Sequence, residues 1–455
     1  MATIIPDVTT IDAGKQISEI RIGIMGNVDS GKSTLTGVLT KQVLDDGNGK
    51  ARSLVMKHKH ELVTGRTSCV THHYTRDIDL EANTERDVTY IDLAGHEKYL
   101  KTTINGIHRC YIDYSIVVIG ANMGMESSTY TVQSKTAGFK TRRDTMKKQV
   151  NMTEEHLSLS LSLAIPTIIV ITKVDICPDA VKDNTLSQIT KFMDRKTLKS
   201  RKPITIKTMS DLDTFMSNYY NATPRNMTTP VPIIEVSSVT GAGLDILREF
   251  IARIPQHIDY NHAKHKPAHF VIDSTYHIKG IGLVVSGIMR SGMIHKGDVL
   301  HIGPIMRNFH AVTIKSIHNN FRELVSHIEA GQSGCFAIKS TNPTKMDIQR
   351  HMIRHGTHIM EKPEVFNEFR ARIKILHHPT TIRLNYEPTV HCGAVTQSAQ
   401  IIHMDRDYIR LGDIADVTFR FKFRPEFIQP EARLVFREGM TRGIGKIIEV
   451  VPYTI

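Results

Sequence analysis

Apolar and polar positions follow two different periods in the first 260 residues. Short apolar runs rich in β-branched residues predict buried strands at 20–26, 87–93, 114–121, 167–172 and 232–237. Between them, apolar residues that recur every three or four positions predict amphipathic helices at 32–44, 96–107, 153–164 and 241–254. Strands that alternate with helices are typical of βαβ units, so we expect a mostly parallel sheet covered by helices on both faces.

The pattern changes in the second half of the chain, where short strand-length runs are punctuated by Gly and Pro and no helical period is present. This texture is typical of antiparallel β-barrels. We therefore predict an N-terminal extension (1–19), an α/β domain (20–260) and two β-barrel domains (264–360 and 363–455).

Composition is that of a globular protein with several domains, because 455 residues suit two to four of them. The five cysteines are scattered without metal-ligand spacing, which favours reduced thiols in an intracellular compartment. The first residues, MATIIPDVTT, lack the basic start and apolar stretch of a signal peptide, and no apolar run is long enough to span a bilayer. We expect a cytoplasmic, monomeric protein with no membrane contact.

Positive charge is concentrated in particular segments of a chain whose formal net charge is +12. Residues 263–455 carry 26 Lys and Arg against 17 Asp and Glu, and the insert-like segment 127–149 carries six against one. Localised positive charge suits a polyanionic partner such as RNA. A solvated surface explains the same charge equally well, so charge alone does not identify the partner.

A glycine-rich motif, G-x-x-x-x-G-K-S, lies between the first predicted strand and the first predicted helix. Backbone N–H groups of such a loop surround phosphate oxygens at a helix N-terminus. Lys32 is expected to reach the β- and γ-phosphates and Ser33 to ligate Mg²⁺. The predicted nucleotide-binding residues of this loop are Gly26, Asn27, Val28, Asp29, Ser30, Gly31, Lys32, Ser33 and Thr34.

A second motif, D-x-x-G-H, follows the next predicted strand. Asp92 at the strand end is expected to hold Mg²⁺ through water, and the Gly95 N–H to detect the γ-phosphate. His96 is placed to orient the attacking water and is, with Lys32, the predicted catalytic residue. Leu93 and Ala94 complete this part of the predicted site.

Two later motifs predict the base pocket. In T-K-x-D after the strand 167–172, the Asp175 carboxylate can accept from N1–H and the amino group of guanine, which adenine cannot offer. In S-S-V after the strand 232–237, a backbone N–H can donate to guanine O6. The predicted residues are Thr172, Lys173, Val174, Asp175, Ser237, Ser238 and Val239.

A polar stretch between the first two motifs contains Gly65, Arg66 and Thr67. A threonine in this position can ligate Mg²⁺ through its hydroxyl, as the first switch of GTPases does, so the predicted metal ligands are Ser33, Thr67 and Asp92. An ordinary loop threonine is the alternative interpretation.

These ordered elements resemble the translational GTPase superfamily, the group of elongation factor Tu, in the motifs GNVDSGKST and DLAGH. The segments KHKHELVTGRTSCV, IDLAGHEKYLKTTINGI, TKVDICP and SSVTGAGLDIL resemble the subfamily of GTP-binding proteins 1 and 2. The resemblance implies Mg²⁺-dependent GTP hydrolysis to GDP, a monovalent cation held by Asp29 and an apolar gate at Val28. It also implies a partner among tRNA, the ribosome and other RNAs.

Three features depart from that pattern. Arg66 stands where many relatives have Ile, Thr172 stands where the base motif usually has Asn, and the segment 127–149 is an insertion relative to elongation factors. The first departure motivates a second hypothesis, a GTP-dependent RNA-binding adaptor with weak hydrolysis. A P-loop kinase or ATPase is a third hypothesis that only the first motif supports.

Other candidate chemistry has ordinary structural explanations. The 24 histidines, such as His262, His265 and His269 or His377 and His378, have no cysteines or carboxylates at metal-ligand spacing, so we expect surface and barrel histidines. The acidic pair Asp45 and Asp46 and the pair at 154–155 fit turn and helix-start positions.

Overall fold

A computed structural model describes residues 16–56, 58–64, 67–79, 84–125, 152–194, 201–220, 230–305, 308–341, 350–353, 356–438 and 441–452. The predicted switch residues Gly65 and Arg66, the insert 127–149 and most of the predicted extension 1–19 lie outside these ranges.

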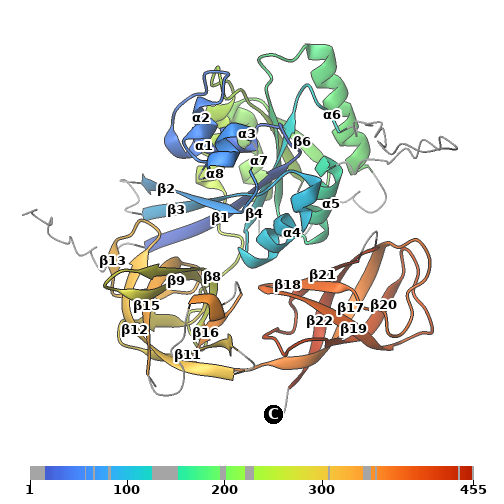
Figure 1. Ribbon diagram of the computed structural model, residues 1–455. Coiled ribbons are helices and arrows are strands. Elements are labelled where there is room, and N and C mark those ends of the chain that lie inside the picture. Colours follow the sequence, from blue (N-terminus) through green and yellow to red (C-terminus); the bar gives the residue numbers. More distant parts are fainter. Residues whose placement is uncertain are drawn as a thin grey trace, which may run out of the picture.

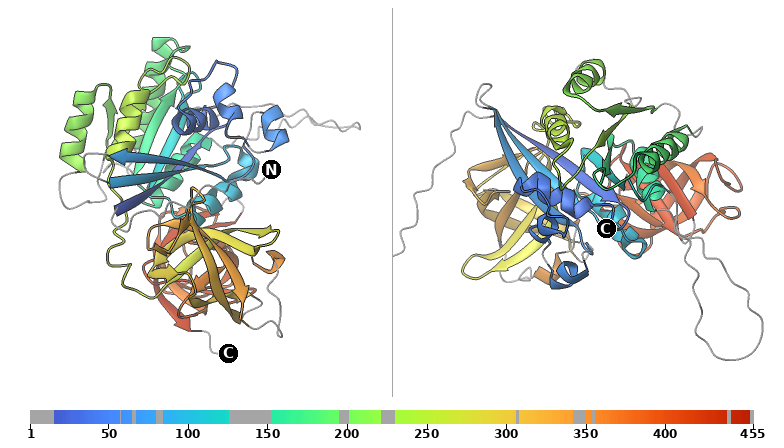
Figure 2. Two further views of the ribbon diagram at one scale, coloured as in Figure 1. Left: turned by 90° about the vertical axis from the view of Figure 1, so that its left-hand side faces the viewer. Right: turned by 90° about the horizontal axis from the view of Figure 1, so that it is seen from above.

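The N-terminal unit is an α/β domain around a seven-stranded sheet in the order β2-β3-β1-β4-β5-β7-β6. All strand pairs are parallel except β2 with β3. Helices lie on both sides of the sheet (Figure 2). Its elements are β1 (Gln16–Gly26), α1 (Lys32–Lys41), α2 (Lys50–Ser53), α3 (Lys59–Thr64), β2 (Thr71–Asp79), β3 (Thr84–Asp92), α4 (Leu100–Arg109), β4 (Tyr114–Gly120), α5 (Met152–Ser162), β5 (Thr167–Thr172), α6 (Asp179–Met193), β6 (Pro203–Ile206), α7 (Met209–Tyr219), β7 (Val231–Glu235) and α8 (Leu244–Arg253).

Burial along the central strands explains the continuous apolar runs in the sequence. Every residue of β4 and β5 is buried. In β4, Ile116 and Val118 join the core on one face of the sheet, while Val117 and Ile119 join the core on the other. A strand buried on both faces cannot alternate apolar with polar residues, which is why these runs read as uniformly apolar.

Several elements of this domain were not anticipated from the sequence, namely β2, β6, α2, α3, α6 and α7. Strand β2 is polar, and its backbone pairs only at the edge of the sheet, with β3. The predicted helix at 32–44 ends earlier, at Lys41, because Gln42 adopts a left-handed conformation with φ of 54° and closes the helix.

The remainder of the described chain forms two antiparallel barrels, drawn in yellow and in orange to red in Figure 1. In the first, six strands follow the order β11-β16-β8-β9-β15-β12, the pairing of β11 with β12 closes the circle, and β13 extends β12. Its strands are β8 (His269–Ile278), β9 (Gly282–Ser291), β10 (Met293–His295), β11 (Val299–Ile305), β12 (Asn308–Asn319), β13 (Leu324–Val325), β14 (His327–Glu329), β15 (Ser333–Ser340) and β16 (His358–Met360).

The second barrel is closed in the order β17-β20-β19-β18-β21-β22. Its strands are β17 (Phe366–His377), β18 (Thr389–Cys392), β19 (Val395–Met404), β20 (Ile414–Phe421), β21 (Arg433–Glu438) and β22 (Thr441–Pro452). Along β17, Phe369, Ala371, Ile373 and Ile375 are buried at alternate positions and fill the interior. The predicted fold class, a parallel α/β domain followed by two antiparallel barrels, is confirmed.

Histidines of the barrels are largely structural, as expected. His269 and His358 are buried, their rings share a hydrogen bond of 3.0 Å, and both lie against Phe427. Burial lowers the pKa of His358 to about 3, so its ring is neutral.

No helix among the described residues combines the length and the apolar character needed to cross a bilayer.

A buried carboxylate joins the α/β domain to the first barrel. Glu19 of β1 accepts hydrogen bonds from the Ser333 N–H (2.7 Å) and hydroxyl (2.6 Å) at the start of β15. The same carboxylate pairs with Arg21 at 2.9 Å, and both side chains are less than a tenth exposed. The interface therefore includes a carboxylate that is largely shielded from water and is paired with Arg21 of its own strand.

A second carboxylate joins the α/β domain to the other barrel. Glu155 of α5 lies between Arg437 and Arg442, which reach it from β21 and β22.

The acidic residues that were interpreted as structural have structural partners. Glu155 pairs with these two arginines, and the Asp45 carboxylate accepts hydrogen bonds from the backbone N–H groups of Gly47 and Ala51.

Replacing Glu19 with Gln should destabilise the protein by about 3 kcal/mol, because it leaves Arg21 as an uncompensated buried charge at the interface. Denaturant unfolding measures the change. Asp213→Asn is the matched control, since its pair with Arg253 is largely exposed and contributes little. Equal effects of the two substitutions would show that the Glu19 pair does not hold the interface.

Candidate functional site

The loop between β1 and α1 forms a concave turn, in which some residues adopt left-handed conformations. Gly31 has φ of 91° and Asp29 has φ of 60°. A Cβ atom at Gly26 would lie 2.2 Å from the Val118 carbonyl oxygen, so only glycine fits there. The Asn27 side chain accepts from the Val28 N–H at 2.7 Å and fixes the entry to the turn.

Lys32, at the first turn of α1, is folded back over this loop. Its Nζ donates to the Asn27 carbonyl at 2.7 Å, and only 7% of the residue is exposed. Burial lowers the pKa of Lys32, while the charges of Asp92 and Asp29 oppose that shift. The ammonium group thus lies in the loop beside a neutral backbone carbonyl. A phosphate in the same place would add a negative charge and a stronger hydrogen bond.

Three side-chain oxygens meet beside Lys32. The Ser33 hydroxyl donates to Asp92 Oδ2 at 2.7 Å, the Thr67 hydroxyl donates to the same oxygen at 3.2 Å, and the two hydroxyls lie 2.7 Å apart. Ser33, Thr67 and Asp92 are the three predicted metal ligands, and the structure brings them together.

The register of the β2–β3 hairpin explains why Thr67 reaches this point. Thr71 pairs directly with Asp92, so the segment that precedes β2 runs past the end of β3. Glu61 of α3, which is fully buried, accepts from the N–H and the hydroxyl of Ser68, both at 2.9 Å. That contact fixes the residue next to Thr67.

The charge of Asp92 is not fully compensated by these hydroxyl groups. Burial raises the pKa of Asp92, and its second oxygen, Oδ1, is buried without a hydrogen-bond partner among the described residues. An oxygen-rich cluster with an unsatisfied carboxylate oxygen has the donor set that Mg²⁺ prefers.

A cavity of about 220 Å³ lies next to the cluster. Its wall is formed by Val28, Asp29, Gly31, Lys32, Ser33, Thr34, Arg52, Thr67, Gly95, His96 and Lys173. His96 is exposed and its Nδ1 accepts from the Lys98 N–H at 3.1 Å. A Cβ atom at Gly95 would lie 2.6 Å from the Gly26 carbonyl oxygen, so a glycine is required for the D-x-x-G-H loop to approach the phosphate loop.

The other residues of that loop support it from the protein interior. Leu93 and Ala94 are buried, the Leu93 N–H donates to the Ile24 carbonyl, and the Ala94 carbonyl accepts from the Thr103 hydroxyl. Neither side chain lines the cavity.

The T-K-x-D segment lies against the phosphate loop. Thr172 donates to the Ser30 carbonyl at 2.6 Å, and Lys173 Nζ donates to the Asp29 carbonyl at 2.8 Å. Val174 packs against the core, and the Asp175 side chain is exposed. Thr172 therefore keeps one contact to the loop even though it lacks an amide.

The S-S-V segment forms a tight turn. The Ser237 hydroxyl accepts from the Val239 N–H at 3.2 Å, and the Ser238 carbonyl accepts from the Asp45 N–H at 2.9 Å. Asp175, Ser238 and Val239 do not line the 220 Å³ cavity. Of the predicted base residues, only Lys173 lines that cavity, together with Lys32, Ser33 and Thr67 from the predicted phosphate and metal residues.

Two residues of this site were missed by sequence reasoning, Arg52 in the cavity wall and Glu61 behind Thr67. Glu61 lies in the segment 57–70 that resembles the subfamily, which was the available signal, whereas Arg52 lies before that segment. No spacing rule connects them to the phosphate loop.

Known proteins agree with this geometry. The family model for the elongation factor Tu GTP-binding domain matches residues 18–257. The chain is 36% identical to GTP-binding protein 1 of Xenopus laevis over 96% of its own length and 64% of that protein. It is 32% identical to GTP-binding protein 2 of Mus musculus over 98% of its own length and 72% of that protein. The chain thus spans about two thirds of the length of these relatives.

Solved structures share the fold. The bacterial selenocysteine-specific elongation factor EF-Sec superposes with a TM-score of 0.65 at 20% identity, covering 94% of this chain and 58% of that one. The GTP-bound GTPase-like domain of S. cerevisiae Ski7 gives 0.66 at 14% identity, covering 94% and 97%. From the domain match and the identity to GTP-binding protein 2, the chain belongs to the elongation factor Tu-like GTPase family.

Proposed function

We propose that this protein binds GTP and hydrolyses it to GDP and phosphate, as a translation-factor-like switch that acts on tRNA, the ribosome or another RNA. The observation that carries this proposal is the meeting of Ser33, Thr67 and Asp92 beside Lys32. Ser33 and Asp92 alone would suffice to bind a metal ion with a nucleotide. The additional contact of Thr67, from a loop distant in the sequence, is what a nucleotide-dependent switch requires.

The phosphates of GTP would lie in the cavity over the loop 26–33. Loop N–H groups and the N-terminus of α1 would bind the oxygens, and Lys32 would exchange its bond to the Asn27 carbonyl for the β- and γ-phosphates. Val28 and Asp29 stand at the cavity wall, where the resemblance assigns them a gate and a monovalent cation site.

Ser33 and Thr67 would hold Mg²⁺ through their hydroxyls and Asp92 would hold it through water. The ion would neutralise charge that develops on the β- and γ-phosphate oxygens. The unpaired Asp92 Oδ1 and the raised pKa of this carboxyl are both features that a bound cation would relieve.

His96 would position the attacking water. Its Nδ1 accepts from the Lys98 N–H, so the neutral ring carries its proton on Nε2. That N–H has no hydrogen-bond acceptor among the described residues and can donate to the water or to a γ-phosphate oxygen. Hydrolysis by the isolated protein should be slow until a partner completes the site, which accelerates related GTPases by about 10³- to 10⁵-fold.

The switch would be transmitted through β2. Arg76 of this strand pairs with Asp87 at 2.8 Å and with Glu323 of the first barrel at 3.2 Å, and its guanidinium lies 4.2 Å from the centre of the Phe321 ring. Since β2 continues from Thr67, loss of the γ-phosphate would loosen Thr67 and disturb the barrel contact.

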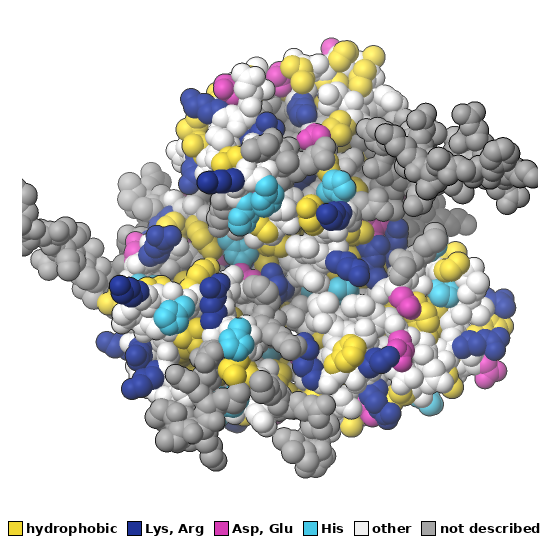
Figure 3. All heavy atoms as spheres, viewed as in Figure 1, with side chains coloured by type: hydrophobic (Ala, Val, Ile, Leu, Met, Phe, Trp, Pro, Cys, Tyr) yellow, Lys and Arg dark blue, Asp and Glu magenta, His cyan; other side chains and the backbone are white. Residues whose placement is uncertain are grey.

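The partner is proposed from charge and from the relatives. On the face in Figure 3, Lys and Arg side chains are spread over both barrels and do not form one compact patch. Such a distribution suits an extended polyanion. EF-Sec and SelB, which share the fold, are elongation factors by name.

A GTP-dependent RNA-binding adaptor with weak hydrolysis is the alternative, motivated by Arg66 in the switch segment. It predicts RNA affinity that differs between the GTP-analogue and GDP forms, while GTP hydrolysis stays slow in the presence of RNA or ribosomes. Filter binding of tRNA in both nucleotide forms, together with phosphate release with and without ribosomes, separates the two functions.

His96→Ala should reduce partner-stimulated GTP hydrolysis by at least about 100-fold, because it removes the group that positions the water. Nucleotide affinity should stay nearly unchanged, since the ring is exposed at the cavity edge. Single-turnover phosphate release measures the rate, and His262→Ala, an exposed histidine outside the cavity, is the control. Persistence of stimulated turnover in the His96 variant would refute the assignment.

Asp175→Asn should weaken GTP binding by about 10- to 100-fold, the effect of losing a hydrogen-bonded charge, and should favour xanthosine triphosphate. Competition of GTP, ATP and the xanthosine nucleotide against a fluorescent GDP analogue measures the preference. Asp179→Asn, a largely exposed carboxylate at the start of α6, should bind as wild type. A protein that prefers ATP, or an Asp175 variant with unaltered preference, contradicts the guanine pocket.

Thr172→Val should lower GDP affinity about 10-fold, because the buried Ser30 carbonyl then loses its donor. Thr172→Ser keeps the hydroxyl and should bind GDP nearly as the wild type does. Dissociation rates of a fluorescent GDP analogue give the comparison. If Thr172→Val and the wild type released the GDP analogue at equal rates, Thr172 would not support the nucleotide-binding loop.

A further inference from the structure

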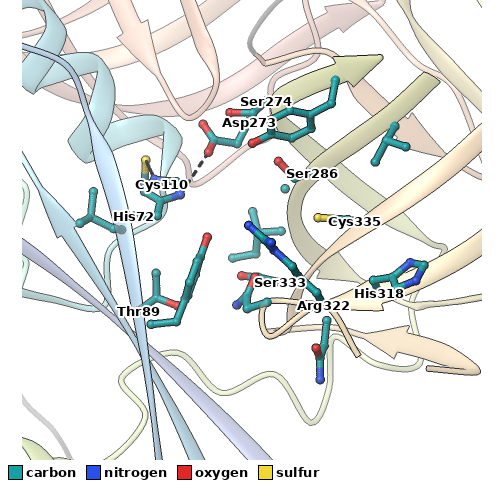
Figure 4. A pocket seen from close by; sticks show the side chains of 18 of the residues that line it. His72, Thr89, Cys110, Asp273, Ser274, Ser286, His318, Arg322, Ser333 and Cys335 are labelled. Atoms are coloured by element: carbon teal, nitrogen blue, oxygen red, sulfur yellow. Dashed lines mark hydrogen bonds and ion pairs between the residues drawn. The ribbon is translucent and has the colours of Figure 1, made fainter. Parts of the chain in front are cut away.

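A larger cavity, of about 910 Å³, lies between the α/β domain and the first barrel. It is separate from the nucleotide cavity, with which it shares no lining residue. Figure 4 shows His72, Cys110 and Asp273 close together on one side of it, with Cys335 on the other side.

The three side chains come from three elements and two domains. His72 lies on β2, Cys110 follows α4, and Asp273 lies on β8 of the barrel. Cys110 Sγ is 3.5 Å from His72 Nε2, and Asp273 Oδ2 is 3.4 Å from His72 Nδ1. One ligand atom from each of the three residues lies within 4.8 Å of the others.

These distances suit a shared metal ion. A tetrahedral zinc ion with bonds of 2.0–2.3 Å separates neighbouring ligand atoms by roughly 3.3–3.8 Å. Cys110 Sγ and His72 Nε2 already have that separation, whereas Asp273 Oδ2 contacts the other ring nitrogen, Nδ1. A shared ion binds one of the two nitrogens, so the carboxylate or the thiol must move toward that nitrogen, over ligand-atom separations that are all within 4.8 Å. Arg109 Nε lies 3.3 Å from Asp273 Oδ1, a second contact of the kind that orients a ligating carboxylate.

A thiol nucleophile is the competing interpretation of a Cys–His–Asp arrangement. Cys110 is only 5% exposed. Reactive cysteines lie in partially exposed surroundings, so a sulfur buried this deeply has little access to an electrophilic substrate. The geometry of the three residues therefore favours metal ligation.

We infer that His72, Cys110 and Asp273 form a binding site for a zinc-class divalent cation, with three protein ligands and a fourth position that faces the interdomain cavity. Sulfur, imidazole and carboxylate are all zinc ligands, and three protein ligands with one open position are typical of accessible zinc sites. The ion would tie the switch strand β2 to the first barrel.

The described residues contain a second cluster, His58, Glu61 and Cys69, whose ligand atoms also lie within 4.8 Å of one another. There the Glu61 carboxylate is already occupied, since it accepts four hydrogen bonds among the described residues, from the His58 N–H, the Ser68 N–H, the Ser68 hydroxyl and the Cys69 thiol. That carboxylate has a structural task beside Thr67, so we assign the ion to the interdomain cluster.

The test uses the full chain, freed of transition metals with a chelator and kept in GDP and Mg²⁺. Titration with Zn²⁺ should give one ion per chain, and Co²⁺ should produce the absorption of a cobalt–thiolate bond. Cys110→Ser, His72→Ala and Asp273→Asn should each weaken Zn²⁺ affinity at least about 10-fold, the lower bound for loss of even an outer-shell partner. Binding of a fluorescent GDP analogue checks that each variant is folded.

Two matched cysteine variants decide the location. Cys335→Ser alters the same cavity outside the cluster, and Cys69→Ser alters the second cluster, so both should keep the Co²⁺–thiolate signal and the Zn²⁺ affinity. The inference is overturned if no stoichiometric ion binds, if a folded Cys110→Ser protein binds as wild type, or if Cys69→Ser abolishes the signal. These readouts need no GTP hydrolysis, so they succeed or fail independently of the proposed function.

Discussion

The carboxylate of Asp92 lies where three segments of the α/β domain meet, buried at the end of β3. A buried carboxylate is costly unless donors or a cation compensate it. Here the Ser33 and Thr67 hydroxyls both point at one oxygen, and the other oxygen is left without a partner among the described residues. Because the Asp92 charge must be compensated, the end of β3 is linked to the phosphate loop through Ser33 and to the switch segment through Thr67.

The consequences extend beyond the site because each of these segments continues into an interface. The chain from Thr67 becomes β2, whose Arg76 reaches Glu323 of the first barrel. The β1 strand that leads into the phosphate loop carries Glu19, which binds Ser333. In the switch proposed above, occupation of the Asp92 site would therefore be transmitted to the first barrel through these two contacts.

Contiguous motifs were predictable from the sequence, since the loop 26–33 and Asp92 follow strands with strong apolar patterns. Strand β2 was not, because an edge strand with polar residues gives no apolar run. The role of Thr67 was predicted from its place between the first two motifs and from the family resemblance, and the structure then supplied its contacts.

Contacts between distant segments were beyond the reach of spacing arguments. Glu19 and Ser333 are 314 positions apart, and the His72, Cys110 and Asp273 cluster joins two domains with no local motif. The cysteines have no metal-ligand spacing in the sequence, but spacing cannot exclude a site assembled by folding. Arg66, the departure in the switch, lies outside the described residues.

The most direct measurement of the central claim is single-turnover hydrolysis of GTP and ATP by the wild-type chain in Mg²⁺, with and without ribosomes charged with aminoacyl-tRNA. The account predicts slow GTP cleavage alone, acceleration toward the roughly 10³- to 10⁵-fold range with the partner, and no comparable use of ATP. Turnover that ignores the partner, or that proceeds equally with ATP, would contradict a GTP switch centred on Asp92.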